Sequence, residues 1–373
     1  MSYLSRRDFV HGALVLGAAG AVSRVFAGQS LAKPQGGDQA ALDLHRSTLV
    51  VDGLDPSSLS VDYLKMLRAG GVDCWHRSVG TSFASFATLL DFCDEHQDQI
   101  APAGSVREIR ALREQGLIAL VSGWQSADGL LVDGEPALHN LRAYRELGLR
   151  ISGIAYNVAN DFGGGCFDPQ IGLTRAGHRL VEKIHESGIV LDLGGHTNEK
   201  TSFDALAIST GVPVICSHTN IRTLNDNPRC STDQLLEAIA RTGGVIGLSA
   251  FNDFHARRAS DAQVPSTPQV NLDRHLDQYD YLKRLVGVDH IGLGPDFIEG
   301  RNDPGPLSAA DQVLMAPEAY SQELPWFYVN GFENIGELPN VTQGLLQRGW
   351  TKPEIHKVLG ENWLRVYEKV WGG

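Results

Sequence analysis

The stretch GIVLDLGGHTNEKTSFDALAISTGVPVICSHTN, residues 188–220, decides the fold. Two apolar runs, 189–193 and 212–217, flank an amphipathic segment, and a histidine closely follows each run, His196 and His218. Two buried strands joined by a helix form a parallel βαβ unit, so both imidazoles are expected at the same rim of the sheet. Imidazole is a common metal ligand and general base. The pair indicates a metal or acid–base site, with two ordinary loop histidines as the alternative.

The same alternation of apolar and amphipathic segments runs along most of the chain. Eight apolar runs are predicted as strands: 49–54, 71–79, 118–123, 149–156, 189–193, 212–217, 245–250 and 290–294. The clearest helices are predicted at 86–96, 137–147, 175–187, 232–242 and 272–286. Eight such units predict an α/β fold, a single-domain (β/α)8 TIM-type barrel. An open doubly wound sheet is the alternative, but the glycines at 163–165 lack its G-x-G-x-x-G spacing.

Composition excludes several classes of function. The 373 residues are 42% hydrophobic and 20% charged, which is ordinary for a globular protein. The net charge of -12, without a basic stripe, argues against nucleic acid as a partner. Five cysteines without a C-x-x-C pair argue against a disulfide framework or a zinc knuckle.

Residues 1–27 are predicted to be a signal peptide outside the fold. Arg6 and Arg7 precede a short apolar run at 10–22, and the sequence VFA at 25–27 resembles a cleavage site. The twin arginine makes the segment resemble a Tat signal, which predicts a periplasmic or otherwise extracytoplasmic protein. The run is too short and glycine-rich to leave a stable membrane anchor. The alternative is a chance Arg-Arg pair before a weak anchor.

The remainder divides into a linker and one large domain. Residues 28–44 are polar and contain glycine and proline, so they are predicted to be a linker, and 45–373 the barrel. Two segments, 256–270 and 301–338, are polar or rich in proline and follow late strands. Both are expected to lie over the mouth of the barrel as lids.

Eight motifs connect the chain with a known family: VDGL at 51–54, RAGGV at 68–72, SGWQ at 122–125, DLGGH at 192–196, SHTN at 217–220, NPR at 227–229, GGVIG at 243–247 and GVDHIGLGPDF at 287–297. In this order and spacing, over about residues 45–368, the chain resembles the membrane (renal) dipeptidase family, zinc peptidases of family M19. The resemblance implies a (β/α)8 barrel, a small peptide substrate and the possibility of a homodimer.

The resemblance also implies roles for particular residues. In the family, two zinc ions share a bridging glutamate; one ion also takes a His-x-Asp pair from the first strand, and the other takes two histidines from the fifth and sixth strands. His196 and His218 match the latter pair. Asp296 matches an acidic residue near the substrate amine, or else caps its loop. Arg229 matches an arginine that holds the substrate carboxylate, or else forms a surface ion pair. Asn220, in the sixth-strand motif, is assigned to substrate binding together with Arg229.

The chain departs from the family pattern at the metal ligands. Leu54 stands in place of the first-strand histidine, and Asp55 would replace it only with a one-residue shift. Gln125 replaces the bridging glutamate, and Tyr156 replaces a further histidine at the end of the fourth strand. Neutral ligands cannot easily hold two dications close together.

We therefore expect at most one zinc ion, held by His196 and His218 with Gln125 or water, and with Asp55 as a further candidate ligand. Such a three-ligand site with an open position is a working catalytic arrangement. Asp296 would then handle protons, and Tyr156 would donate a hydrogen bond to the developing oxyanion.

Three functions remain open at this point. The first is an exported metallodipeptidase, with one metal ion, that cleaves small dipeptides or dipeptide-like amides. The second is a non-hydrolytic periplasmic protein that binds a small peptide, for example during maturation of a peptide siderophore. The third is a metal-dependent amidohydrolase acting on a lactone or cyclic amide, because a fold does not fix a reaction.

Overall fold

The computed structural model describes residues 38–256, 269–298, 309–322 and 328–372. The predicted signal peptide and large parts of both predicted lids lie outside the described residues. All eight predicted strands are present: β1 (Val51–Asp55), β2 (Cys74–Ser78), β4 (Ile118–Trp124), β7 (Leu149–Ser152), β8 (Val190–Leu191), β9 (Cys216–Thr219), β10 (Ile246–Leu248) and β11 (Ile291–Leu293).

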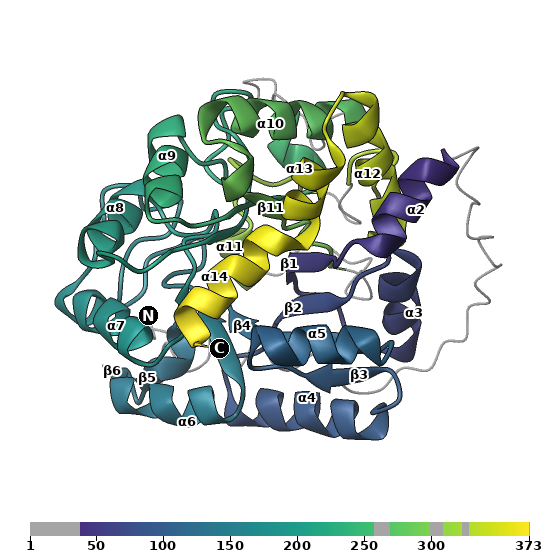
Figure 1. Cartoon of the computed structure of the whole chain (residues 1–373). Helices are drawn as coiled ribbons and strands as arrows, with labels where there is room; N and C mark the ends of the chain where they lie inside the picture. Colours follow the sequence, from purple (N-terminus) through teal and green to yellow (C-terminus); the bar gives the residue numbers. More distant parts are fainter. Residues whose placement is uncertain (1–37, 257–268, 299–308, 323–327, 373) are drawn as a thin grey trace.

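Hydrogen bonds join these strands into a ring of parallel neighbours. One sheet runs in the order β1-β2-β4-β7-β8, and a second contains β9, β10 and β11. Between β8 and β9, the Ile215 amide donates to the Leu191 carbonyl at 3.0 Å and the Leu193 amide donates to the Ile215 carbonyl at 2.8 Å. Beyond β11, the Asp296 amide donates to the Leu54 carbonyl of β1 at 3.1 Å. The predicted (β/α)8 barrel is confirmed, with its helices around the strands (Figure 1).

Short polar residues begin most of the surrounding helices. Side chains of Ser60, Ser82, Ser105, Thr174, Asn198, Thr232 and Asn271 each accept a hydrogen bond from a first-turn amide. Each satisfies a donor that a helix start leaves unpaired. The helices are α3 (Val61–Ala69), α4 (Phe83–Glu95), α5 (Val106–Glu114), α6 (Leu141–Glu146), α7 (Arg175–Glu186), α8 (Glu199–Ile208), α9 (Asp233–Arg241), α10 (Leu272–Leu285), α11 (Ala309–Leu314), α12 (Leu338–Gln347), α13 (Lys352–His356) and α14 (Asn362–Trp371). Among the helices in the described ranges, none has the length and apolarity needed to cross a bilayer.

The sequence prediction missed several short elements. Helix α2 (Gln39–Ser47) begins inside the range expected to be linker, because Asp38 caps its first turn and Leu44 is buried against the barrel helices. Strand β3 (Ile100–Pro102) pairs with β4, and β5 (Leu131–Val132) and β6 (Glu135–Pro136) form a hairpin. Runs of two or three residues show no periodicity that a sequence pattern can detect.

Helix α14 closes one end of the barrel. Trp363 and Tyr367 of this helix pack against the inward-facing residues Val51 and Val190. The close contact requires glycine at position 53, where a Cβ atom would lie 2.2 Å from the Leu293 carbonyl oxygen and 2.4 Å from the Trp363 ring. A functional site can therefore open only at the opposite end of the barrel, at the carboxyl ends of the strands (Figure 1). Barrel enzymes carry their sites at that end.

Candidate functional site

The two strand-end histidines meet at the carboxyl end of the barrel. His218 lies in β9, and His196 follows β8. Their ring centroids are 4.8 Å apart, and both side chains are almost wholly buried. The convergence expected from the parallel arrangement of the strands is therefore present.

A fixed amide sets the tautomer of His196. Its Nδ1 atom lies 2.6 Å from Asn157 Oδ1, while Asn157 Nδ2 donates to the Leu314 carbonyl at 2.6 Å and to the Tyr320 hydroxyl at 3.2 Å. Because the Asn157 nitrogen is engaged in this way, its oxygen faces the histidine and accepts the Nδ1 proton. Burial, with Arg229 and His218, holds the pKa of His196 well below its ordinary value, so the ring is neutral and Nε2 carries a lone pair.

A serine and an aspartate set the tautomer of His218. The Ser217 hydroxyl donates to Asp192 Oδ2 at 2.5 Å and lies 2.8 Å from His218 Nδ1. Because that hydroxyl donates its hydrogen bond to Asp192, its oxygen accepts a hydrogen bond from Nδ1–H of His218. Asp192 Oδ1 also accepts the Ser217 and Gly194 amides, each at 2.8 Å. Nε2 of His218 is buried and has no hydrogen-bond partner among the described residues.

Gln125 and Arg229 complete the cluster around His196. Gln125 Oε1 lies 2.7 Å from His196 Nε2, and Gln125 Nε2 donates to Ser78 Oγ at 3.0 Å. Arg229 Nη2 lies 3.2 Å from the same His196 nitrogen, and Arg229 Nε donates to the Tyr320 hydroxyl at 2.6 Å. The Arg229 guanidinium is 1% exposed, and its Nη1 has no hydrogen-bond partner within the described ranges.

The charge on Arg229 persists despite this burial. Although burial alone would lower it, the pKa of Arg229 lies above its ordinary value because Tyr320, Cys166 and Asp296 are nearby. The guanidinium also lies 5.2 Å from the centroid of the Phe254 ring, a distance typical of cation–π contacts. The alternative of a surface ion pair at Arg229 is therefore wrong.

Tyr156 and Asp296 border the cluster. The Tyr156 ring stacks on His196 with centroids 3.9 Å apart and an interplanar angle of 23°. Asp296 follows β11 with a backbone φ of 61°. Residues other than glycine seldom adopt this conformation, and it recurs at functional sites. Its backbone bond to Leu54 holds this turn against the first strand.

Two residues expected in the site make hydrogen bonds with groups other than His196 and His218. The Asp55 carboxylate accepts the Ser57 amide at 2.6 Å and the Tyr63 hydroxyl, and burial raises its pKa to about 6. Asn220 Nδ2 lies 3.2 Å from the Ser249 carbonyl and 3.2 Å from His255 Nε2. These contacts engage the Asp55 carboxylate and the Asn220 amide nitrogen at the strand ends, whereas Asn220 Oδ1 has no hydrogen-bond partner among the described residues.

The cluster offers two imidazole rings and one amide oxygen as donor groups toward a divalent ion. Metal-binding histidines donate their second ring nitrogen to a nearby acceptor, as His196 and His218 do. Gln125 Oε1 lies 2.7 Å from His196 Nε2, and His218 Nε2 has no hydrogen-bond partner among the described residues. Leu54, at the family's histidine position in β1, offers no donor atom. In the parts of the chain that the structure describes, no group of three histidine, cysteine, aspartate or glutamate side chains is arranged to hold a metal. Two imidazoles and an amide oxygen would carry no charge to stabilise a second dication.

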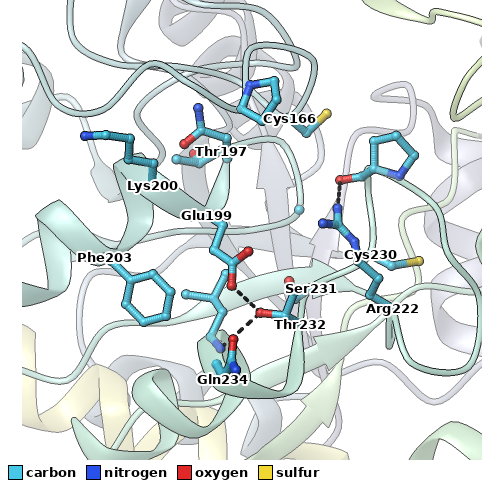
Figure 2. Close-up of a pocket in the computed structure, with 15 residues that line it drawn as sticks. Cys166, Thr197, Glu199, Lys200, Phe203, Arg222, Cys230, Ser231, Thr232 and Gln234 are labelled. Carbon is cyan, nitrogen blue, oxygen red and sulfur yellow. Dashed lines mark hydrogen bonds between the residues drawn. The ribbon is translucent and has the colours of Figure 1, made fainter.

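A separate cavity of about 440 Å³ lies behind the His196 loop, between the starts of α8 and α9 (Figure 2). Lys200 and Arg222 line it, and helix amino ends attract anions. However, the Glu199 carboxylate already accepts a hydrogen bond from Thr232 at the start of α9. Lys200 pairs with Asp204, and Arg222 donates to the Pro228 carbonyl, so these polar groups of the cavity are engaged within the protein.

Sequence reasoning missed the residues that orient the histidines. Asp192 and Ser217 stand inside the quoted motifs, one to four positions from a histidine, and that proximity was the available signal. Asn157 follows Tyr156 directly. Tyr320 belongs to the long proline-rich segment, where no pattern distinguishes it from its neighbours.

Known proteins match both the sequence and the fold. The profile of the family described as membrane dipeptidase (peptidase family M19) matches residues 73–313 and 326–371. A protein of Klebsiella pneumoniae described as uncharacterized, in the pqqA 5′ region, is 31% identical over 72% of this chain and 88% of its own length. An uncharacterized dipeptidase of Schizosaccharomyces pombe is 28% identical over 70% of this chain and 55% of its own length.

Among solved structures, an amidohydrolase of Pseudomonas aeruginosa superposes with a TM-score of 0.78 at 27% identity, over 89% of this chain and 99% of that one. The family profile covers most of the chain, and the structural match extends over nearly the whole barrel. This chain therefore belongs to the membrane dipeptidase family, peptidase family M19, a family of dipeptidase-like hydrolases.

Proposed function

We propose that this chain is an exported hydrolase that cleaves small dipeptides or dipeptide-like amides and works with at most one metal ion. The observation that carries the proposal is the meeting of His196, His218 and Gln125 beside a buried arginine. His196 and His218 would hold the ion through Nε2, and Gln125 through Oε1. When bound, it would supply Lewis-acid activation of the scissile carbonyl and of water.

Arg229 is suited to the carboxylate of the substrate. Its charge is buried, and Nη1 has no hydrogen-bond partner among the described residues. Burying a cation is costly, and a carboxylate can accept two parallel hydrogen bonds from a guanidinium. A dipeptide carboxylate would therefore add negative charge to that of the nearby Asp296 and supply the missing acceptor for Nη1.

Tyr156 and Asp296 would act on the peptide bond and on the amine. Tyr156, stacked on His196, would donate a hydrogen bond to the oxyanion that develops during hydrolysis. Asp296, held at the end of β11, would bind the substrate amine or carry protons.

A second candidate is binding of a small peptide without cleavage. It is favoured by the ligand chemistry of the site, since Leu54 and Gln125 replace family ligands with an apolar and a neutral side chain. In that case Arg229 and Asp296 would still recognise the two ends of a peptide. Export to the periplasm, proposed from the twin arginine at positions 6 and 7, suits either role.

A dipeptide panel with the purified protein lacking residues 1–27 tests the proposal. Turnover and binding would be measured for peptides with L- and D-configured carboxyl-terminal residues, with and without added zinc, alongside the H218A variant. The proposal predicts turnover that zinc restores to the metal-stripped protein and that H218A abolishes. Peptide binding without turnover at every zinc concentration would favour the second candidate, and neither turnover nor binding would refute both.

A further inference from the structure

A single lone pair on His196 Nε2 has two competing uses. Arg229 Nη2 can only donate, so its contact with Nε2 places the proton of this neutral ring on Nδ1, facing Asn157 Oδ1. Arg229 Nη2, 3.2 Å away, is a donor and satisfies Nε2, whereas Gln125 Oε1, 2.7 Å away, is an acceptor and does not. The same lone pair is the one that a metal ion held by this cluster needs.

The guanidinium is held in this position by its surroundings. Tyr320 accepts from Arg229 Nε at 2.6 Å, and the Phe254 ring lies against the guanidinium. On the other side, a Cβ atom at Gly195 would lie 2.0 Å from Arg229 Nη1. The second glycine of the Gly194-Gly195 pair thus leaves the space that lets Arg229 approach His196.

We propose that Arg229 and a divalent cation compete for His196, and that a carboxylate bound to Arg229 relieves the competition. A cation on His196 Nε2 displaces the hydrogen bond from Arg229 and is repelled by its charge. A carboxylate neutralises that charge and offers a better acceptor for the Nη2 proton. Metal and carboxylate therefore bind cooperatively, and each raises the affinity for the other by the same factor.

The inference rests on the proposed one-ion site and adds a rule for how that site fills. Without an acid, the protein binds metal weakly, because the arginine occupies the ligand atom. With an acid bound, metal affinity rises by a factor on the order of 5 to 150, the usual range of coupling between two sites. The substrate carboxylate thereby promotes binding of the metal that would act on its own amide bond.

Zinc calorimetry and cobalt absorption on the mature protein test the inference. Zinc affinity would be measured with and without N-acetylglycine, which has a carboxylate and an amide but no free amine to chelate the metal. Cobalt(II), in place of zinc, reports a site built from protein ligands by its visible absorption. The wild type should bind both ions more tightly when N-acetylglycine is present.

Three variants separate the competition from general effects. R229M removes the charge, so it should bind zinc tightly without the acid and show no dependence on it. Y320F keeps the charge but removes the acceptor of Arg229 Nε, so it should bind zinc at an intermediate affinity. R222M is the matched control, because Arg222 donates to the Pro228 carbonyl and, within the described ranges, makes no hydrogen bond with His196, and it should behave as the wild type. Thermal unfolding of each variant checks that the fold is intact.

Two results would overturn the inference in distinguishable ways. Equal zinc affinity of the wild type with and without N-acetylglycine, and no gain in R229M, would refute the competition while leaving a one-ion hydrolase intact. Absence of zinc and cobalt binding in every variant, R229M included, would refute both the competition and the metal ion of the proposed function.

Discussion

Replacing Ser217 with alanine tests whether the Asp192–Ser217 pair controls the chemistry at His218. The hydroxyl now donates to Asp192 Oδ2 and accepts from His218 Nδ1. Its loss leaves a buried N–H without an acceptor, at about 1–3 kcal/mol, and removes a hydrogen bond to a carboxyl group worth about 1.5–3 kcal/mol. The S217A variant should therefore lose about 2.5–6 kcal/mol of unfolding free energy in a denaturant titration.

The same substitution should also impair the site beyond its effect on stability. Without Ser217, the proton of His218 is no longer held at Nδ1, and loss of such an orienting partner typically lowers metal affinity or activity about 10–100-fold. S249A is the matched control, since Ser249 is equally buried at the end of the neighbouring strand β10 and its hydroxyl lies 3.5 Å from the Pro295 carbonyl. Equal zinc affinity and equal histidine nitrogen NMR shifts in S217A and S249A would refute the orienting role.

Three further predictions concern stability, pH and geometry. W363A should lower the free energy of unfolding by about 3–5 kcal/mol in a denaturant titration, because it leaves a cavity at the closed end of the barrel. W371A should lower it less, because Trp371 is only partly buried. Burial raises the pKa of Asp55 to about 6 from an ordinary 3.8, so the folded state holds this proton more tightly, and the free energy of unfolding falls as pH rises through that interval. D55N should reduce this loss between pH 4 and 7 by up to about 3 kcal/mol, and an unchanged dependence of unfolding free energy on pH would contradict this. G195A should push Arg229 aside, raising the KM for dipeptides more than it lowers kcat, and an unchanged KM would argue against the close contact.

The barrel was predictable because its strands are apolar runs long enough to stand out between amphipathic helices. The predicted strand 290–294 matches β11 (Ile291–Leu293), and the other seven predicted strands are found as well. Elements of two or three residues, such as β3, carry too little pattern to be detected. Helix α2 was hidden because its neighbours are rich in glycine and its first residues are polar.

The site was predictable where residues come from strand ends and unpredictable where they come from distant loops. His196 and His218 could be paired from sequence because parallel strands bring their ends together. The contact of Arg229 with Tyr320 joins positions 91 residues apart, and no sequence pattern links the two. The contacts of Asp55 were unpredictable for a local reason, since a register irregularity between β1 and β2 at this point accompanies the bonding of its carboxylate to Tyr63.

Anomalous X-ray scattering at the zinc edge, from crystals grown with zinc and N-acetylglycine, would test the central claim most directly. The account predicts one peak within bonding distance of Nε2 of both His196 and His218, with the added carboxylate on Arg229. Two adjacent peaks, or a single peak bound elsewhere with Arg229 still on His196, would contradict it.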